Sequence, residues 1–318
     1  MLNVSEELKR RLQEANRELR RVYPSGVFEP RLIRERLARI GRFSPIRKWT
    51  GGQMNAWLAG GSLVGVDGSV NSTPGTHPHT LSVFQALAKG TRGEEHWDAD
   101  LYTPLLDTDE AGEEGELARE AKQRGRLLAG LEIGVAREAI RRWKPRVIMM
   151  DGSLLHFWID QPEAWEALAE EAEKAGVLLV GVAEEIGTRT LARRLFPDGT
   201  ACADREILFG VMQSGEVFLS ELLNPSGPAL WKAVICSSSS PQPVGVDGLL
   251  SQEGDREELL RLVHTLTPAQ GRGIPLWLDI VDREVRVTDP LVAALVEKYI
   301  DPDLRHRLLV PKRKDRVL

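Results

Sequence analysis

The 318-residue sequence is poor in cysteine and has no long apolar segment. Cys202 and Cys236 are its only cysteines, and no Cys/His cluster surrounds them. This argues against a disulfide-stapled secreted domain and against a zinc site, and it favours free thiols in a reducing cytoplasm. No run approaches the roughly 20 apolar residues that span a bilayer, and residues 1–11 lack the apolar centre of a signal peptide. We therefore expect a cytoplasmic protein that is not inserted in a membrane.

Two common catalytic signatures are also missing. There is no P-loop lysine motif, so any use of ATP must belong to a partner. There is no Gly-x-Ser-x-Gly elbow to make a nucleophile of Ser69 or Ser153. A hydrophobic share of 42% and a charged share of 28% are typical of an ordinary globular protein with a sizeable core.

The net charge of −5 is unevenly distributed. Residues 1–50 carry 13 Lys/Arg against 6 Asp/Glu, and residues 305–318 carry 6 against 1, so the middle of the chain is strongly acidic. Basic ends around an acidic centre suit a metal-dependent enzyme that grips an anionic polymer at its periphery. The alternative is that these charges are solvated helix faces.

Hydrophobic periodicity predicts an alternating α/β chain after a helical start. The expected elements are strands at 62–66, 80–87, 96–102, 146–150 and 177–182, and helices at 113–143, 162–175 and 188–195. Three hairpin-linked strands followed by alternating helices and strands match the ribonuclease H-like fold, a mixed sheet with helices on both faces. In that fold the first and fourth strands lie side by side. We expect residues 1–61 to form an N-terminal helical extension and residues 62–318 to form the nuclease-like domain.

The outer parts of the chain give weaker patterns. Residues 4–22 predict an amphipathic helix, and residues 45–61 look like a connector with glycine turns. Residues 275–287 are expected to be extended or a hairpin, and residues 289–300 to form a closing helix.

Two Asp-Gly-Ser sequences are the main chemical signal. Asp67 ends the apolar run Leu-Val-Gly-Val, and Asp151 ends Val-Ile-Met-Met. Because these runs are the first and fourth strands, the two carboxylates should meet at one edge of the sheet. Another Asp-Gly pair, at Asp247, follows Pro-Gln-Pro and is interpreted as a turn.

Two facing carboxylates repel each other unless a cation lies between them, and hard oxygen ligands favour Mg²⁺ or Mn²⁺ over zinc. Glu132 is a charge among apolar residues of the long helix. It either turns to solvent or has a buried partner such as a metal ion.

The Leu-Val-Gly-Val-Asp-Gly-Ser strand, the second Asp-Gly-Ser strand and the helical Leu-Glu-Ile step 19 residues before Asp151 resemble the NurA nuclease family. The resemblance implies a Mn²⁺-dependent nuclease acting on single- and double-stranded DNA. It implies a homodimer that works with the hexameric ATPase HerA in DNA-end resection and repair. It also implies that Asp67, Glu132 and Asp151 bind the metal.

Two positions depart from the family pattern. The lysine that often follows the fifth strand is replaced by Ala183-Glu184-Glu185, and the C-terminal helix lacks a histidine. The missing histidine is consistent with an altered activity, with a different fourth ligand such as Asp279 or Asp289, or with a divergent bacterial branch of the family.

The sequence therefore predicts a metal-dependent deoxyribonuclease. The alternatives are another ribonuclease H-like nuclease acting on RNA or branched DNA, and a non-catalytic scaffold that binds DNA or an ATPase.

Overall fold

A computed structural model describes the chain except for residues 1–3, 24–25, 27, 107–115, 198–201 and 310–318. Its centre is a nine-stranded mixed sheet with the strand order β1-β7-β8-β9-β6-β5-β2-β3-β4. The strands are β1 (Arg42–Pro45), β2 (Leu63–Ser72), β3 (Ser82–Gly90), β4 (Glu95–Tyr102), β5 (Val147–Asp151), β6 (Leu178–Ala183), β7 (Glu216–Leu219), β8 (Leu230–Cys236) and β9 (Val244–Leu249).

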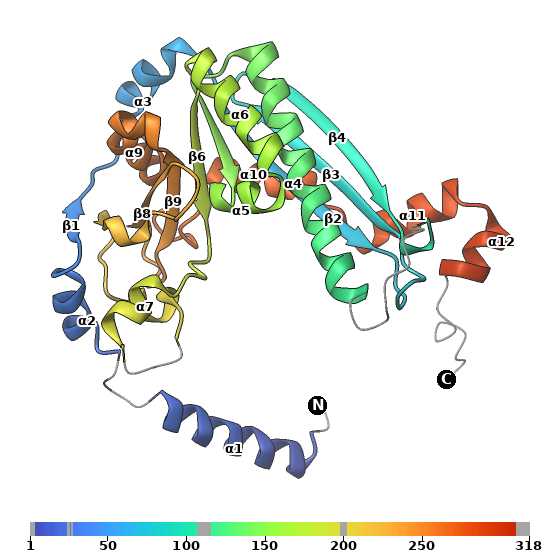
Figure 1. Ribbon diagram of the computed structural model, residues 1–318, viewed down its shortest axis with the longest axis horizontal. Coiled ribbons are helices and arrows are strands. Elements are labelled where there is room, and N and C mark those ends of the chain that lie inside the picture. Colours follow the sequence, from blue (N-terminus) through green and yellow to red (C-terminus); the bar gives the residue numbers. More distant parts are fainter. Residues whose placement is uncertain (1–3, 24–25, 27, 107–115, 198–201, 310–318) are drawn as a thin grey trace.

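Helices pack on both faces of this sheet (Figure 1). The α-helices are α1 (Glu6–Val22), α2 (Pro30–Leu37), α3 (Gly51–Trp57), α4 (Glu116–Trp143), α5 (Leu154–Asp160), α6 (Pro162–Ala175), α7 (Thr190–Leu195), α8 (Asp204–Leu208), α9 (Arg256–Leu266), α10 (Leu276–Val285), α11 (Asp289–Tyr299) and α12 (Pro302–Leu304). In the described part of the chain, no helix combines the length and apolar character that crossing a membrane requires.

The strand pairing confirms the predicted fold class. Strands β2, β3 and β4 form an antiparallel meander, and β5 and β6 continue the sheet from β2 in parallel. The first and fourth strands of the predicted order, β2 and β5, are therefore neighbours, as expected of a ribonuclease H-like core. Antiparallel β9, β8, β7 and β1 extend the sheet beyond β6.

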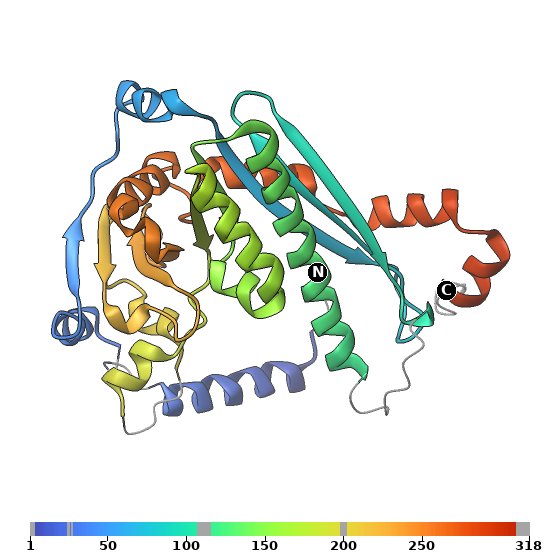
Figure 2. The same ribbon diagram turned by 45° about the horizontal axis from the view of Figure 1, so that its top comes forward.

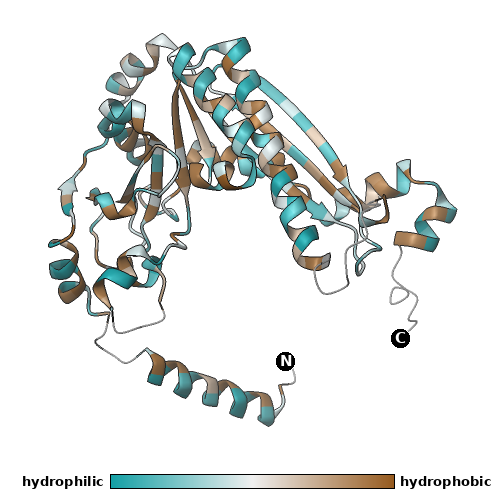
Figure 3. Ribbon diagram, in the orientation of Figure 1, coloured by the Kyte–Doolittle hydropathy of each residue, from teal (hydrophilic) through white to brown (hydrophobic). Residues whose placement is uncertain are grey.

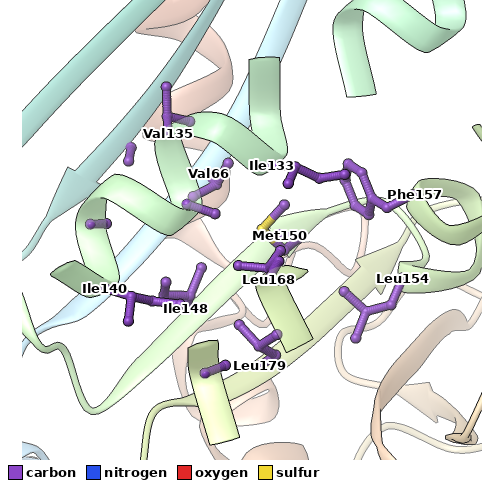
Figure 4. Close-up of a cluster of buried hydrophobic side chains, with 14 of the residues drawn as sticks. Val66, Ile133, Val135, Ile140, Ile148, Met150, Leu154, Phe157, Leu168 and Leu179 are labelled. Atoms are coloured by element: carbon purple, nitrogen blue, oxygen red, sulfur yellow. The ribbon is translucent and has the colours of Figure 1, made fainter. Parts of the chain in front are cut away.

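The core between α4, α5, α6 and the sheet is apolar. Val66 and Met150 point from adjacent strands toward Ile133 of α4 and Phe157 of α5 (Figure 4). All four side chains are at most 1% exposed. This packing fixes the ends of β2 and β5 relative to α4.

One segment near the C-terminus differs from its predicted structure. Residues 275–287 were expected to be extended or a hairpin, but they form α10. Leu278, Val281 and Val285 are buried at spacings of three and four residues, which is a helical period. The β-branched residues favour a strand locally, and burial against β2 and β3 overrides that preference.

Two further interpretations were wrong. The Asp247 segment is strand β9 rather than a turn, because it pairs with both β6 and β8. Residues 45–61 are not a plain connector, since α3 lies within them. The Thr50 hydroxyl oxygen accepts a hydrogen bond from the Gln53 backbone amide, and the Thr50 backbone amide donates one to Gln53 Oε1. This capping box starts the helix.

The first 61 residues contain two contrasting parts. Strand β1 pairs with β7 and so belongs to the main sheet. Helix α1 has no buried residue and lies away from the sheet in both views (Figures 1 and 2). Its apolar side chains at Leu8, Leu12 and Leu19 are all more than 50% exposed, and Figure 3 shows hydrophobic segments in brown recurring along α1.

Candidate active site

Asp67 lies within β2 and faces α10. Side chains alternate along a strand, so Leu63, Gly65 and Asp67 share one face. A side chain at Gly65 would collide with Trp277 of α10, which shows how closely that helix covers this face. Asp67 is only 7% exposed, and the Gly68 amide donates a hydrogen bond to its Oδ1 at 2.7 Å.

Asp151 ends β5, directly beside β2. Val147 and Met149 pack in the same core cluster as Leu63, so Asp151 projects from the same face of the sheet as Asp67. The parallel register pairs Val66 with Met150, which puts the two aspartates at the same level. The structure thus brings together the two acids predicted to meet.

Glu132 approaches from the opposite face, on α4. A methyl group at position 68 would lie 2.7 Å from Glu132 Oε1 and 2.8 Å from a methyl group of Leu128. Glycine at 68 is therefore what lets the Glu132 carboxylate come close to β2. Glu132 is 6% exposed, so this charge is buried and does not turn to solvent.

The environment raises the pKa of all three acids. Burial raises the pKa of Asp67 to about 7, and the charge of Asp151 adds to the rise. Burial also raises the pKa of Glu132 well above its usual range, with further contributions from Asp67 and Asp151. Among the described residues, no Lys, Arg or His nitrogen lies within 4.0 Å of any of the three carboxylates. Asp67 and Glu132 are buried and Asp151 is half-buried, and in the described part of the chain this acid cluster has no bonded cation.

A charged rim surrounds this cluster. Burial raises the pKa of Asp151 to about 6, Arg272 opposes the rise, and Asp282 and Glu184 add to it. Arg272 itself forms an ion pair with Glu184 and donates from Nη2 to Asp279 Oδ1 at 2.7 Å. The nearest positive group is therefore already engaged by two rim carboxylates.

Asp282 is an acid near the candidate site that the sequence analysis did not predict. It is electrostatically coupled to both Asp67 and Asp151. Its helical spacing from buried Leu278 and Val285 was the available signal, and the expectation of an extended segment obscured it.

The two proposed substitute ligands are otherwise occupied. Asp279 holds Arg272, as described above. Asp289 begins α11 and accepts a hydrogen bond from Asn71 Nδ2 at 2.7 Å.

The chemistry of the three acids fits a divalent cation. They are hard oxygen donors, they repel one another, and burial makes their negative charge costly unless a cation balances it. As the described part of the chain stands, no three His, Cys, Asp or Glu side chains are already arranged to hold a metal ion.

Comparison with known families identifies the chain. Residues 61–287 match the NurA domain. The protein belongs to the NurA family. This membership covers most of the chain and supports a nuclease activity, as the acid motifs had predicted. No functionally curated protein matches the sequence.

The NurA-family chain also has distant likenesses among solved structures. Human endonuclease V is 15% identical, with a TM-score of 0.35, over 80% of this chain and 94% of that one. Endonuclease V of Ciona intestinalis with inosine-containing DNA is 13% identical, with a TM-score of 0.33, over 80% and 93%. Thermus thermophilus RuvC is 16% identical, with a TM-score of 0.15, over 45% and 74%. These scores are low, so the fold description above rests on the strand order itself.

Proposed function

We propose that this protein is a divalent-metal-dependent deoxyribonuclease that hydrolyses phosphodiester bonds in single- and double-stranded DNA. Asp67, Glu132 and Asp151 would hold Mn²⁺ or Mg²⁺. The observation that carries the proposal is the cluster of these three acids, in which Asp67 and Glu132 are buried and Asp151 is half-buried, and which has no bonded cation among the described residues. Buried carboxylates with raised pKa values are expected where function requires them.

Each acid would have a separate part in the reaction. Asp67 and Asp151 would bind the metal from one face of the sheet, and Glu132 would complete the site past Gly68. A bound divalent ion supplies charge neutralisation at the phosphate and a lowered pKa for attacking water. Because Arg272 is paired with Glu184 and Asp279, it would hold the rim in place rather than compete for the acids.

The assembly implied by family membership is part of the proposal. A homodimer working with a HerA-type hexameric ATPase in DNA-end resection and repair, in the cytoplasm, would use surfaces outside the acid cluster. Helix α1 supports such a surface, because its apolar stripe is exposed. Amphipathic helices of this kind commonly dock into a partner's groove.

A nuclease assay separates the proposal from its alternatives. Purified protein should degrade DNA with Mn²⁺ or Mg²⁺ and lose the activity with EDTA. A preference for RNA or branched DNA would favour the alternative that the protein is another kind of ribonuclease H-like nuclease. DNA binding without any cleavage in either metal would favour the non-catalytic scaffold.

A further inference from the structure

Asp247 lies in a second buried polar cluster next to the proposed site. It comes from β9 and is 3% exposed. Its Oδ1 accepts a hydrogen bond from the Leu154 amide at 2.9 Å, and its Oδ2 accepts one from the Ser153 hydroxyl. Lys232 Nζ of β8 lies 3.3 Å from Asp247 Oδ2 and 3.0 Å from Ser153 Oγ. Ser153 follows Asp151 by two residues, so this cluster reaches the proposed site through the backbone.

The sheet leaves space for this contact. Gly181 of β6 is paired in register with Asp247. Any side chain at position 181 would collide with the Asp247 carboxylate and with the Gly152 carbonyl. The absence of a side chain at Gly181 therefore allows Asp247 to reach across β6 to the start of α5.

The turn after Asp151 is held on both sides. Gly152 has a φ of +96°, a conformation that favours glycine. Its amide donates to the Val182 carbonyl at 2.9 Å, and the next two residues are bound by Asp247. Asp151 thus sits at the end of a strand whose exit is fixed by one backbone bond and one buried side-chain cluster.

We propose that Asp247 and Lys232 are positioning residues, which hold the Ser153 turn so that the Asp151 carboxylate points into the metal site. This inference rests on the proposed function. Residues that orient metal ligands without touching the metal commonly change metal affinity or activity by about 10- to 100-fold when replaced. Lys232 balances the charge of Asp247, so the cluster stays neutral and needs no ion of its own.

Ser153→Ala is the mildest test. It removes the hydroxyl link and leaves the Asp247–Lys232 pair and the Leu154 amide bond in place. Ser153 also caps α5 through the Leu155 amide at 3.3 Å, so we expect a loss of a few degrees in Tm. If the Ser153 hydroxyl had a purely structural role, this loss in Tm would be the only effect of the substitution. The positioning role also predicts a rise of about 10- to 100-fold in the Mn²⁺ concentration for half-maximal cleavage, with the KM for DNA unchanged.

Two further variants sharpen the test. Ser153→Thr keeps the hydroxyl and should restore the wild-type Mn²⁺ requirement. Asp247→Asn combined with Lys232→Met removes both charges together and should reproduce or exceed the Ser153→Ala effect. Glu185→Gln is the control. Ser153, Lys232 and Asp247 line a cavity of about 270 Å³, and Glu185 lines it too, but Glu185 pairs with Arg205 outside the cluster. This control should leave the Mn²⁺ requirement unchanged.

Calorimetric titration of each folded variant with Mn²⁺, without DNA, distinguishes the two proposals. A wild type that binds no Mn²⁺ and cleaves no DNA would overturn the proposed function. A wild type that binds and cleaves, together with a Ser153→Ala variant and a double variant that both keep its Mn²⁺ affinity and kcat, would overturn the positioning role alone. Weaker Mn²⁺ binding in both, restored in Ser153→Thr, is the result we expect.

Discussion

Asp-Gly pairs at the sheet occur in two regions of this molecule, and their aspartate carboxylates differ in the partners that they have. At Asp247 the carboxylate has a lysine, a hydroxyl and an amide as partners. Burial raises the pKa of all three aspartates. Asp67 and Asp151 differ in that no Lys, Arg or His nitrogen of the described residues lies within 4.0 Å of them, and Arg272 is held by other acids. A buried charge that is paired contributes to the fold, whereas a buried charge left unpaired costs stability. The unpaired region is therefore the one where we place function.

Replacing the unpaired acids should give the largest effect on activity. Asp67→Asn or Asp151→Asn removes a proposed metal ligand without changing side-chain size, so cleavage of DNA in Mn²⁺ should fall to background. The double variant Asp282→Asn/Arg286→Gln serves as a control, because it removes a rim acid together with its ion-pair partner. It should retain measurable cleavage. Near-normal turnover in either single variant would contradict the site assignment.

The paired acid should give the largest effect on stability. Asp247→Ala would leave the half-buried Lys232 without its counter-charge, and breaking a fully buried pair costs about 3–5 kcal/mol, which is the upper limit for this loss. Lys232→Met in the Asp247→Ala background should recover part of that loss. Denaturant unfolding measures both changes, and an Asp247→Ala protein as stable as the wild type would show that the pair is not structural.

The unpaired acids should have the opposite effect on stability, and it should depend on pH. The pKa of Asp67 rises to about 7 in the folded protein, against about 4 in an unfolded chain. Folding therefore takes up a proton between these values, and metal-free wild type loses stability as pH rises from about 4 to about 7. Asp67→Asn lacks the part of this loss that comes from Asp67, while Glu132 and Asp151, whose pKa values are also raised, still contribute theirs. It should match the wild type near pH 4 and be more stable by roughly 2–4 kcal/mol at pH 8.

Denaturant unfolding of both proteins in EDTA, across this pH range, tests that difference. A constant gap between the two proteins, or a gap that shrinks as pH rises, would rule out a raised pKa at Asp67.

Helix α1 should matter to partners more than to catalysis. Replacing Leu12 and Leu19 by Ser, or deleting residues 1–24, should leave basal cleavage intact and weaken association with a HerA-type ATPase or a second subunit. Arg17 and Arg21 lie on the other side of the helix, so replacing both by Ser is the matched control. Sedimentation analysis with and without the ATPase reports the outcome, and unchanged association of the leucine variant would refute a docking role.

The basic C-terminus should give the smallest effect. Arg305 and Arg307 are described in the structure, whereas the remaining basic residues of the predicted tail, Lys312, Arg313, Lys314 and Arg316, lie outside the described residues. If the tail contacts phosphates, each lost charge should reduce the salt slope of duplex binding by roughly 0.9. Truncation after residue 300 should weaken DNA binding without altering the metal requirement. The same affinity and slope in the truncated protein would exclude this role.

Much of the central sheet was predictable because its strands are short apolar runs with clear ends. The adjacency of Asp67 and Asp151 followed from strand order alone. The Asp247 segment was wrongly predicted to be a turn because it is short and follows Pro-Gln-Pro. Its strand conformation depends on pairing with β6 and β8, which the local sequence does not show. Asp282 was missed because the helical character of α10 depends on burial against distant strands, which local residue preferences do not reveal.

Thermal unfolding with Mn²⁺ at pH 8 tests the central claim most directly. The account holds that the buried acids lack a counter-charge until a divalent ion binds. Mn²⁺ should therefore raise the Tm of the wild type in a concentration-dependent way, because a ligand that binds only the folded state stabilises it. The same titration should leave the Tm of Asp67→Asn and Asp151→Asn nearly unchanged. Equal increases in the wild type and both variants would place the ion elsewhere and contradict the account.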